Sequence, residues 1–182
     1  MEEQPSLDYR LLPEFEETGS YRKLEGTLPL TCLRRGHQFF ELKDGVSYRI
    51  ELTNTGGGVL LRGFARSAGI AECARCLEEA AFDVEGGVEG YYILNPTEQE
   101  IEQSDDEFTA MPSDGVVDLA TPIIAAIIYE LPQVLLCRED CAGLCPVCGV
   151  NLNVGSCDCD RMDVSDGPFA ALNALKGLIE SD

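Results

Sequence analysis

Nine cysteines are the residues of this chain with the clearest chemistry, and six of them lie within the 23 residues from Cys137 to Cys159. The centre of this stretch, Cys145-Pro-Val-Cys148-Gly149, is typical of a metal knuckle, because two thiolates separated by two residues can hold one ion. The glycine relieves the positive φ that such a turn imposes. Another pair, Cys73-Ala-Arg-Cys76, lies earlier in the chain, and Cys32 stands apart.

Metal binding accounts for these spacings better than disulfides do. The chain begins Met-Glu-Glu-Gln, without the basic and apolar segments of a secretory signal. We therefore expect a reducing, cytoplasmic environment, in which clustered cysteines usually bind metal. Soft thiolates in tetrahedral sets of four favour zinc, and the spacings match no ferredoxin iron–sulfur motif. A thiol-redox role for the pairs and simple buried thiols are the alternatives.

Eight clustered cysteines make two sets of four. One set, which a short hairpin at Asn151-Leu-Asn153 would bring together, should hold one structural zinc: Cys145, Cys148, Cys157 and Cys159. The other set would then tie the sheet to the cysteine stretch: Cys73, Cys76, Cys137 and Cys141. Cys141 could also replace Cys157 or Cys159, which would leave a single complete site.

The charge of the chain is strongly acidic and unevenly distributed. Thirteen Lys and Arg stand against 33 Asp and Glu, for a net charge of −20. Nucleic-acid binders usually present a basic face, so this balance disfavours extensive direct RNA binding. Residues 22–76 carry nine bases and five acids, whereas residues 77–137 carry fourteen acids and no base. The acidic part is either a solvated surface or a docking face for a basic partner.

Hydrophobic patterning predicts an α+β fold. Five strand-like segments lie between residues 21 and 94 and would form an antiparallel sheet or a partly closed β-barrel: LEGTLPL, QFFEL, VSYRIELT, VLLRGFA and AAFDVEGGVEGYYIL. Asn54-Thr-Gly-Gly-Gly58 has the glycines of a hairpin turn. Residues 118–131 predict one buried helix, capped by Asp118 or Thr121 and stopped by Pro132. A C-terminal amphipathic helix is expected over residues 168–179.

These elements suggest four regions. They are an acidic N-terminal arm (1–20), a β-rich domain (21–94), an acidic loop (95–117), and a last region (118–182) in which the buried helix, the zinc knuckle and the C-terminal helix pack on the sheet. His37 is the only histidine, and no Ser/His/Asp or Cys/His set can be assembled around it. We therefore expect no enzyme, although a small metal-dependent hydrolase would need only an open metal position.

The chain resembles the YceD family, the large ribosomal RNA subunit accumulation proteins, over roughly residues 24–179. The resemblance rests on these segments: Cys73-x-Arg75-Cys76-Leu77-Glu78, Asp118-Leu119, Leu131-Pro132, Leu136-Cys137, Cys141-x-Gly-Leu-Cys145-Pro-x-Cys148-Gly, Asn151-Leu-Asn153, Cys157-x-Cys159 and Phe169-Ala-Ala-Leu. The sequence departs from the family at Asp166-Gly167-Pro168, where members often carry Asp-Pro-Arg. The resemblance implies a cytoplasmic accessory factor for accumulation of 23S ribosomal RNA, with no demonstrated reaction, and it does not imply a catalytic residue.

This implied role gives the charged regions two possible partners. The acids of the loop could mimic RNA and bind a basic ribosomal protein or assembly factor: Glu98, Glu100, Glu102, Asp105, Asp106 and Glu107. The basic region could instead contact 23S ribosomal RNA directly, through Arg34, Arg35, Arg62 and Arg66. We favour the first, because fourteen acids without a base produce the stronger field. A zinc-delivery or thiol-redox protein is the alternative function.

Overall fold

The computed structural model describes residues 5–11, 15, 17–94, 108–110 and 115–159. The chain divides into two compact units, and each is considered by itself. The larger unit comprises Met1–Ala74 and Glu78–Arg138, and it holds the strands and the helix. The smaller unit comprises Arg75–Leu77 and Glu139–Asp182, and it holds most of the cysteine stretch.

The main sheet of the larger unit has seven strands among the described residues. Its order is β2-β5-β6-β4-β3, and β7 lies on the other side of β6 and pairs with β8. The bounds are β2 (Tyr21–Leu28), β3 (Cys32–Arg35), β4 (Gln38–Leu42), β5 (Val46–Asn54), β6 (Gly58–Glu72), β7 (Glu79–Ile93) and β8 (Phe108–Ala110). All pairs are antiparallel except β7 with β8, which is parallel.

A short ribbon and one helix complete the described part of the larger unit. The strands β1 (Asp8–Arg10) and β9 (Val116–Asp118) pair antiparallel, and α2 (Ala120–Glu130) follows. Asp118 Oδ1 accepts a hydrogen bond from Ala120 N–H at 2.8 Å, so this side chain satisfies a donor at the start of the helix. Leu131 ends the helix before Pro132, which cannot continue it.

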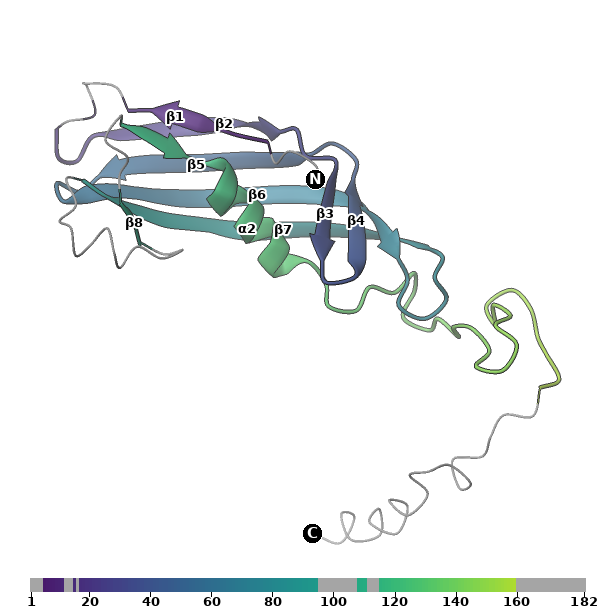
Figure 1. Cartoon of the computed structure of the whole chain (residues 1–182). Coiled ribbons are helices and arrows are strands. Elements are labelled where there is room, and N and C mark those ends of the chain that lie inside the picture. Colours follow the sequence, from purple (N-terminus) through teal and green to yellow (C-terminus); the bar gives the residue numbers. More distant parts are fainter. Residues whose placement is uncertain (1–4, 12–14, 16, 95–107, 111–114, 160–182) are drawn as a thin grey trace, which may run out of the picture. The chain divides into compact units, whose positions relative to one another are not determined.

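The hydrophobic core lies between α2 and one face of the sheet. Figure 1 shows α2 crossing this face, and its main contacts are with β7, β6 and β5. The helix is apolar nearly all round, yet it buries one side, through Ile123, Ile124, Ala126 and Ile127. The sheet supplies fully buried residues that include Phe40, Val46, Leu52, Val59, Leu61 and Val88. Tyr129 on the other side of α2 is 85% exposed, so the expected burial of the helix holds for one face only.

The predicted α+β class is confirmed, while several details of the sheet differ from the prediction. The five predicted strands correspond to β2, β4, β5, β6 and β7, and the turn after Asn54 joins β5 to β6 with Gly56 at φ 90°. The sheet is mostly antiparallel and is not closed into a barrel among the described residues, because β2 at one edge pairs with β5 and not with β3, β7 or β8. The sequence pattern missed β3, since Cys-Leu-Arg-Arg has no clear alternation. Of the acidic loop predicted over 95–117, residues 95–107 and 111–114 lie outside the described residues, as does the predicted C-terminal helix, while Phe108–Ala110 and Val116–Asp118 form β8 and β9.

Candidate metal centres

The structure brings eight cysteines together in two groups of four. The sulfur atoms of each group lie within 4.8 Å of one another. The first centre, as we call it, is Cys73, Cys76, Cys137 and Cys141, and the second centre is Cys145, Cys148, Cys157 and Cys159. These are the two sets that the spacing predicts. A tetrahedral zinc ion with bonds of about 2.3 Å would hold its sulfurs about 3.8 Å apart, so both groups fit such an ion.

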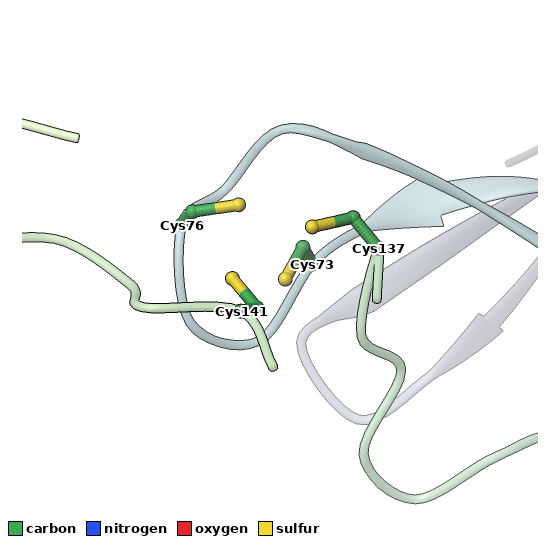
Figure 2. A group of neighbouring side chains, drawn as sticks. All are labelled: Cys73, Cys76, Cys137 and Cys141. Carbon is green, nitrogen blue, oxygen red and sulfur yellow. The ribbon is translucent and has the colours of Figure 1, made fainter. Parts of the chain in front are cut away.

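The first centre takes its ligands from two loops. Figure 2 shows the four sulfur atoms pointing toward one another, with Cys73 and Cys76 on the loop between β6 and β7. Cys73 N–H donates to Glu78 O at 2.8 Å, and Leu77 takes a left-handed φ of 62° to close this turn. A bulky residue rarely adopts this conformation, because it costs conformational free energy. The hydrogen bond that closes the turn must therefore offset this cost at Leu77.

The other loop of the first centre follows α2. Ala74 N–H donates to Leu135 O at 2.8 Å, which pairs the two loops beside Cys73 and Cys137. Arg75 Nη1 donates to Cys141 O at 3.0 Å, and Leu144 N–H donates to Arg75 O at 3.1 Å. Arg75 therefore fixes the segment that carries Cys141. Its place between two cysteines was visible in the sequence, but its contacts were not.

The second centre repeats the turn geometry of the first. Cys145 N–H donates to Val150 O at 2.8 Å, five residues on, as Cys73 does to Glu78. Gly149 has φ 75° and its N–H donates to Cys145 O at 2.9 Å. The glycine expected here therefore occupies the left-handed position, which Leu77 occupies in the other turn. The two Cys-x-x-Cys pairs therefore lie on turns of the same backbone geometry.

Two asparagines organise the loop that carries both Cys141 and Cys145. Asn153 Nδ2 donates to the sulfur of Cys141 at 3.4 Å and to Asn151 Oδ1 at 2.8 Å. Asn153 Oδ1 accepts from Ala142 N–H at 2.8 Å. A donor aimed at a sulfur favours the thiolate form that metals require. The sequence suggested only a hairpin at these residues, so this contact with a candidate ligand is new.

The two centres differ in their access to solvent. In the first, Cys73, Cys76 and Cys141 are buried and only Cys137 is exposed. In the second, only Cys145 is buried, while Cys148 is exposed. Reagents and chelators should therefore reach the second centre more easily.

Proton binding at the second centre is expected to compete with metal binding. Hydrogen bonds from the backbone N–H groups of Cys148 and Val147 lower the pKa of Cys145 to about 6. The side chain of Cys148, together with burial, raises the pKa of Cys159 to about 12. At neutral pH the metal-free group thus keeps protons that the metal must displace.

Metal affinity of the second centre should therefore rise with pH between about 6 and 12 and fall more steeply below 6, where Cys145 also binds a proton. Zinc titrations by calorimetry, in buffers of different ionisation enthalpy, count the protons released. A Cys145→Ser variant, which keeps the first centre, supplies the matched control. Zinc binding without proton release would contradict this expectation.

The arginines predicted to bind RNA do not form one free basic patch. Arg66 on β6 forms an ion pair with Glu85 on β7. Arg62 lies between Glu51 of β5 and Glu89 of β7 in the strand register. Nearby, Lys23 pairs with Glu51 at 3.7 Å. Acids of neighbouring strands thus compensate the bases on the exposed face of the sheet.

The two arginines of β3 are each engaged in a contact, Arg35 with a distant part of the chain and Arg34 with its own turn. Arg35 Nη1 donates to Leu131 O at the end of α2. Arg34 Nε donates to Gly36 O at 2.9 Å, and its guanidinium lies 5.4 Å from the centre of the Phe39 ring. The predicted acidic residues, Glu98, Glu100, Glu102, Asp105, Asp106 and Glu107, lie outside the described residues. The sequence could not show the cross-strand pairing, because it depends on register.

This fold and these sites define the class of the protein, which is an α+β protein with two four-cysteine centres. The family of the large ribosomal RNA subunit accumulation protein YceD matches residues 65–176, which include all eight clustered cysteines. This match covers more than half of the chain, so the chain belongs to the YceD family. No solved structure matches it.

One curated relative, from Zea mays, carries the family's name, and two mycobacterial relatives are uncharacterized. An uncharacterized protein of Mycobacterium tuberculosis is 37% identical over 95 residues, which are 52% of this chain and 45% of the relative. An uncharacterized protein of Mycobacterium leprae is 27% identical over 148 residues, 80% of this chain and 67% of the relative. A Zea mays protein named large ribosomal RNA subunit accumulation protein YCED homolog 1, chloroplastic, is 27% identical over 158 residues, 72% of this chain and 52% of the relative. The chain spans about half the length of the Mycobacterium tuberculosis and Zea mays relatives. Within the described residues, no helix is long and apolar enough to cross a membrane.

Proposed function

We propose that this chain is a non-enzymatic, cytoplasmic accessory factor for the accumulation of 23S ribosomal RNA and the biogenesis of the large ribosomal subunit. The observation that carries the proposal is the family match over residues 65–176, together with the name of the maize relative. In this role the protein would act by binding a ribosomal component. The two cysteine centres would each hold a structural zinc ion, for which four thiolates and no water are suited.

A basic protein, rather than RNA, is the partner that the charges favour. Residues 77–137 carry fourteen acids and no base. The bases of the sheet face, by contrast, lie beside acids, as in the ion pairs Arg66–Glu85 and Arg49–Glu25. A phosphate backbone would have to displace these carboxylates. A Lys- or Arg-rich protein surface would be attracted by the carboxylates of the acidic part, which outnumber those that the bases of the sheet engage, such as Glu85.

Deletion of the gene tests the role itself. Cells without the protein are expected to lose 23S relative to 16S ribosomal RNA and to accumulate less large subunit, measured by RNA blot and sucrose gradient. Re-expression of the full chain should restore both. An unchanged ratio of 23S to 16S RNA would reject the proposed function.

The nature of the partner is tested by pull-down from lysate with and without ribonuclease. Retention of ribosomal proteins after ribonuclease, and its loss on reversal of the six acids from Glu98 to Glu107, is the expected result. Capture that vanishes with ribonuclease and does not respond to the charge reversal would show that RNA is the partner.

Exposure of the second centre favours one other function, zinc delivery or thiol redox chemistry. Cys148 is exposed, and Cys157 and Cys159 are half-buried. A delivery protein would pass zinc to a metal-free acceptor peptide within minutes, and a redox protein would cycle between dithiol and disulfide. A structural centre should do neither under native conditions. Thiol counting before and after such incubation distinguishes a structural centre from one that delivers zinc or cycles between dithiol and disulfide.

A further inference from the structure

Among the described residues, one edge of the main sheet is unpaired over most of its length. β7 pairs with β6 along one side, but on its other side the only described partner is β8, which covers Tyr91 to Ile93. From Glu79 to Gly90, no other described strand pairs with this edge. The edge of a strand carries backbone N–H and C=O groups that can pair with another extended chain.

A groove runs beside this edge, between β7 and α2. Its volume is about 750 Å³. Its lining includes Glu89, Tyr91 and Tyr92 from β7 and Thr121, Tyr129 and Glu130 from α2. An extended peptide that adds to a strand next to a helix places alternate side chains into such a groove. Edge and groove together therefore have the form of a peptide-binding site.

The chemistry of this site suits cationic side chains. Glu130 and Tyr129 of α2 line the groove, and the ring of Tyr129, which is 85% exposed, could stack on an arginine or lysine. The outward-facing positions of β7 carry four acids, Glu79, Asp83, Glu85 and Glu89, of which Glu85 pairs with Arg66 and Glu89 lies opposite Arg62 of β6. Gly87 and Gly90 carry no side chain, so a second backbone can approach closely there.

The same charges disfavour a second copy of this chain at the edge. Pairing of β7 with β7 of another molecule would bring two rows of like charge together, which destabilises a sheet. Acidic edge residues thus protect the strand from self-association and leave it open to a basic segment. The occupant is selected by charge complementarity.

We propose that the open edge of β7, with the groove beside α2, binds an extended Lys- or Arg-rich segment of a protein partner by strand addition. This inference rests on the proposed function and specifies the kind of partner and the surface that binds it. One row of the segment's side chains enters the groove near Glu130 and Tyr129. The other row faces the acidic outer side of β7.

The first test measures binding of a synthetic octapeptide of alternating arginine and threonine to the full-length protein. Glu89→Lys with Glu130→Lys should weaken binding about tenfold or more, because two favourable charge contacts become repulsive. The matched control, Glu25→Lys with Glu41→Lys, changes the net charge equally on β2 and β4, away from the groove. It should weaken binding no more than about threefold, as expected for long-range screening alone. Equal losses in both variants would overturn the proposal.

The second test uses the unaltered protein, so it does not depend on how the variants fold. An octapeptide N-methylated at alternate residues keeps its charge but loses the backbone donors of one edge, and it should bind about tenfold more weakly when the methylated edge faces β7. Hydrogen exchange should slow in the β7 segment 79–90 on peptide binding and stay unchanged in β2. Equal affinity of both peptides, preference for an oligouridine RNA, or a β7-dependent dimer in sedimentation would overturn strand addition.

Complementation separates this inference from the proposed function. In cells that lack the protein, the Glu89→Lys, Glu130→Lys variant should fail to restore the 23S to 16S ratio, whereas the control variant restores it. Full rescue by both variants would overturn the docking site and leave the function standing. No rescue by the unaltered chain would contradict the function itself.

Discussion

Chelation of the bound metal is expected to unfold residues 139–159 and to leave the sheet and α2 folded. The reason is the lack of an apolar core in this segment: its buried hydrophobic residues are Cys141 and Cys145, whereas Val147 and Val154 are 62% and 85% exposed. A structural zinc can contribute on the order of 10 kcal/mol to such a segment. The larger unit has its own core around Phe40, Leu61 and Ile127, which are fully buried.

The measurement combines zinc release with two structural probes. A metallochromic indicator should report two ions per chain, the second centre losing its ion first because Cys148 is exposed. Hydrogen exchange should then increase in residues 139–159, while β5, β6 and α2 stay protected. Loss of all structure in one transition would show that the metal stabilises the whole protein.

Single substitutions assign the ions to their centres. Cys145→Ser should lower the zinc content from two ions to one, and Cys73→Ser should do the same at the other centre. Cys32→Ser is the matched control: this half-buried cysteine belongs to neither group, so the content should stay at two. One ion per chain in the unaltered protein would reject the two-centre assignment.

The grouping of the cysteines could be predicted because spacing limits which thiols can share an ion. A Cys-x-x-Cys pair constrains its own turn, and the turn at Gly149 was predicted on this basis. The left-handed Leu77 could not be predicted, since an isolated leucine gives no turn signal. That residue is placed by the surrounding hydrogen bonds, such as Cys73 N–H to Glu78 O.

The same limit applies to the sheet. Its individual strands could be predicted from local sequence patterns, but the pairing of those strands could not. Alternation in Val46–Asn54 identified β5, because its apolar residues lie on one face. The register that sets Arg62 beside Glu51 and Glu89 depends on contacts far apart in the chain. For this reason the charge count predicted a basic region, while the folded chain compensates that region with acids. The open edge of β7 was equally invisible, since it depends on which strands pair.

A second large effect, a loss of folding stability, is expected from a substitution at the contact between α2 and β7. A Cβ added at Gly86 would lie 2.3 Å from the carbonyl oxygen of Ala126, which is backbone and cannot turn aside. Gly86→Ala should therefore push the helix away from the sheet and lower the free energy of unfolding by about 3 kcal/mol. Loosening here would also expose Ile123 and Ile127, which the contact keeps buried.

The neighbouring glycine supplies the control for this contact. A Cβ added at Gly87 meets no heavy atom within 4 Å, so Gly87→Ala makes the same chemical change on the same strand without the clash. Its free energy of unfolding should stay within about 1 kcal/mol of the unaltered protein, since alanine also restricts the unfolded chain. Urea denaturation of both variants, followed by circular dichroism, gives the comparison. Equal stability of the two would mean that α2 does not press against β7 at Gly86, and the packing that supports the groove would have to be reconsidered.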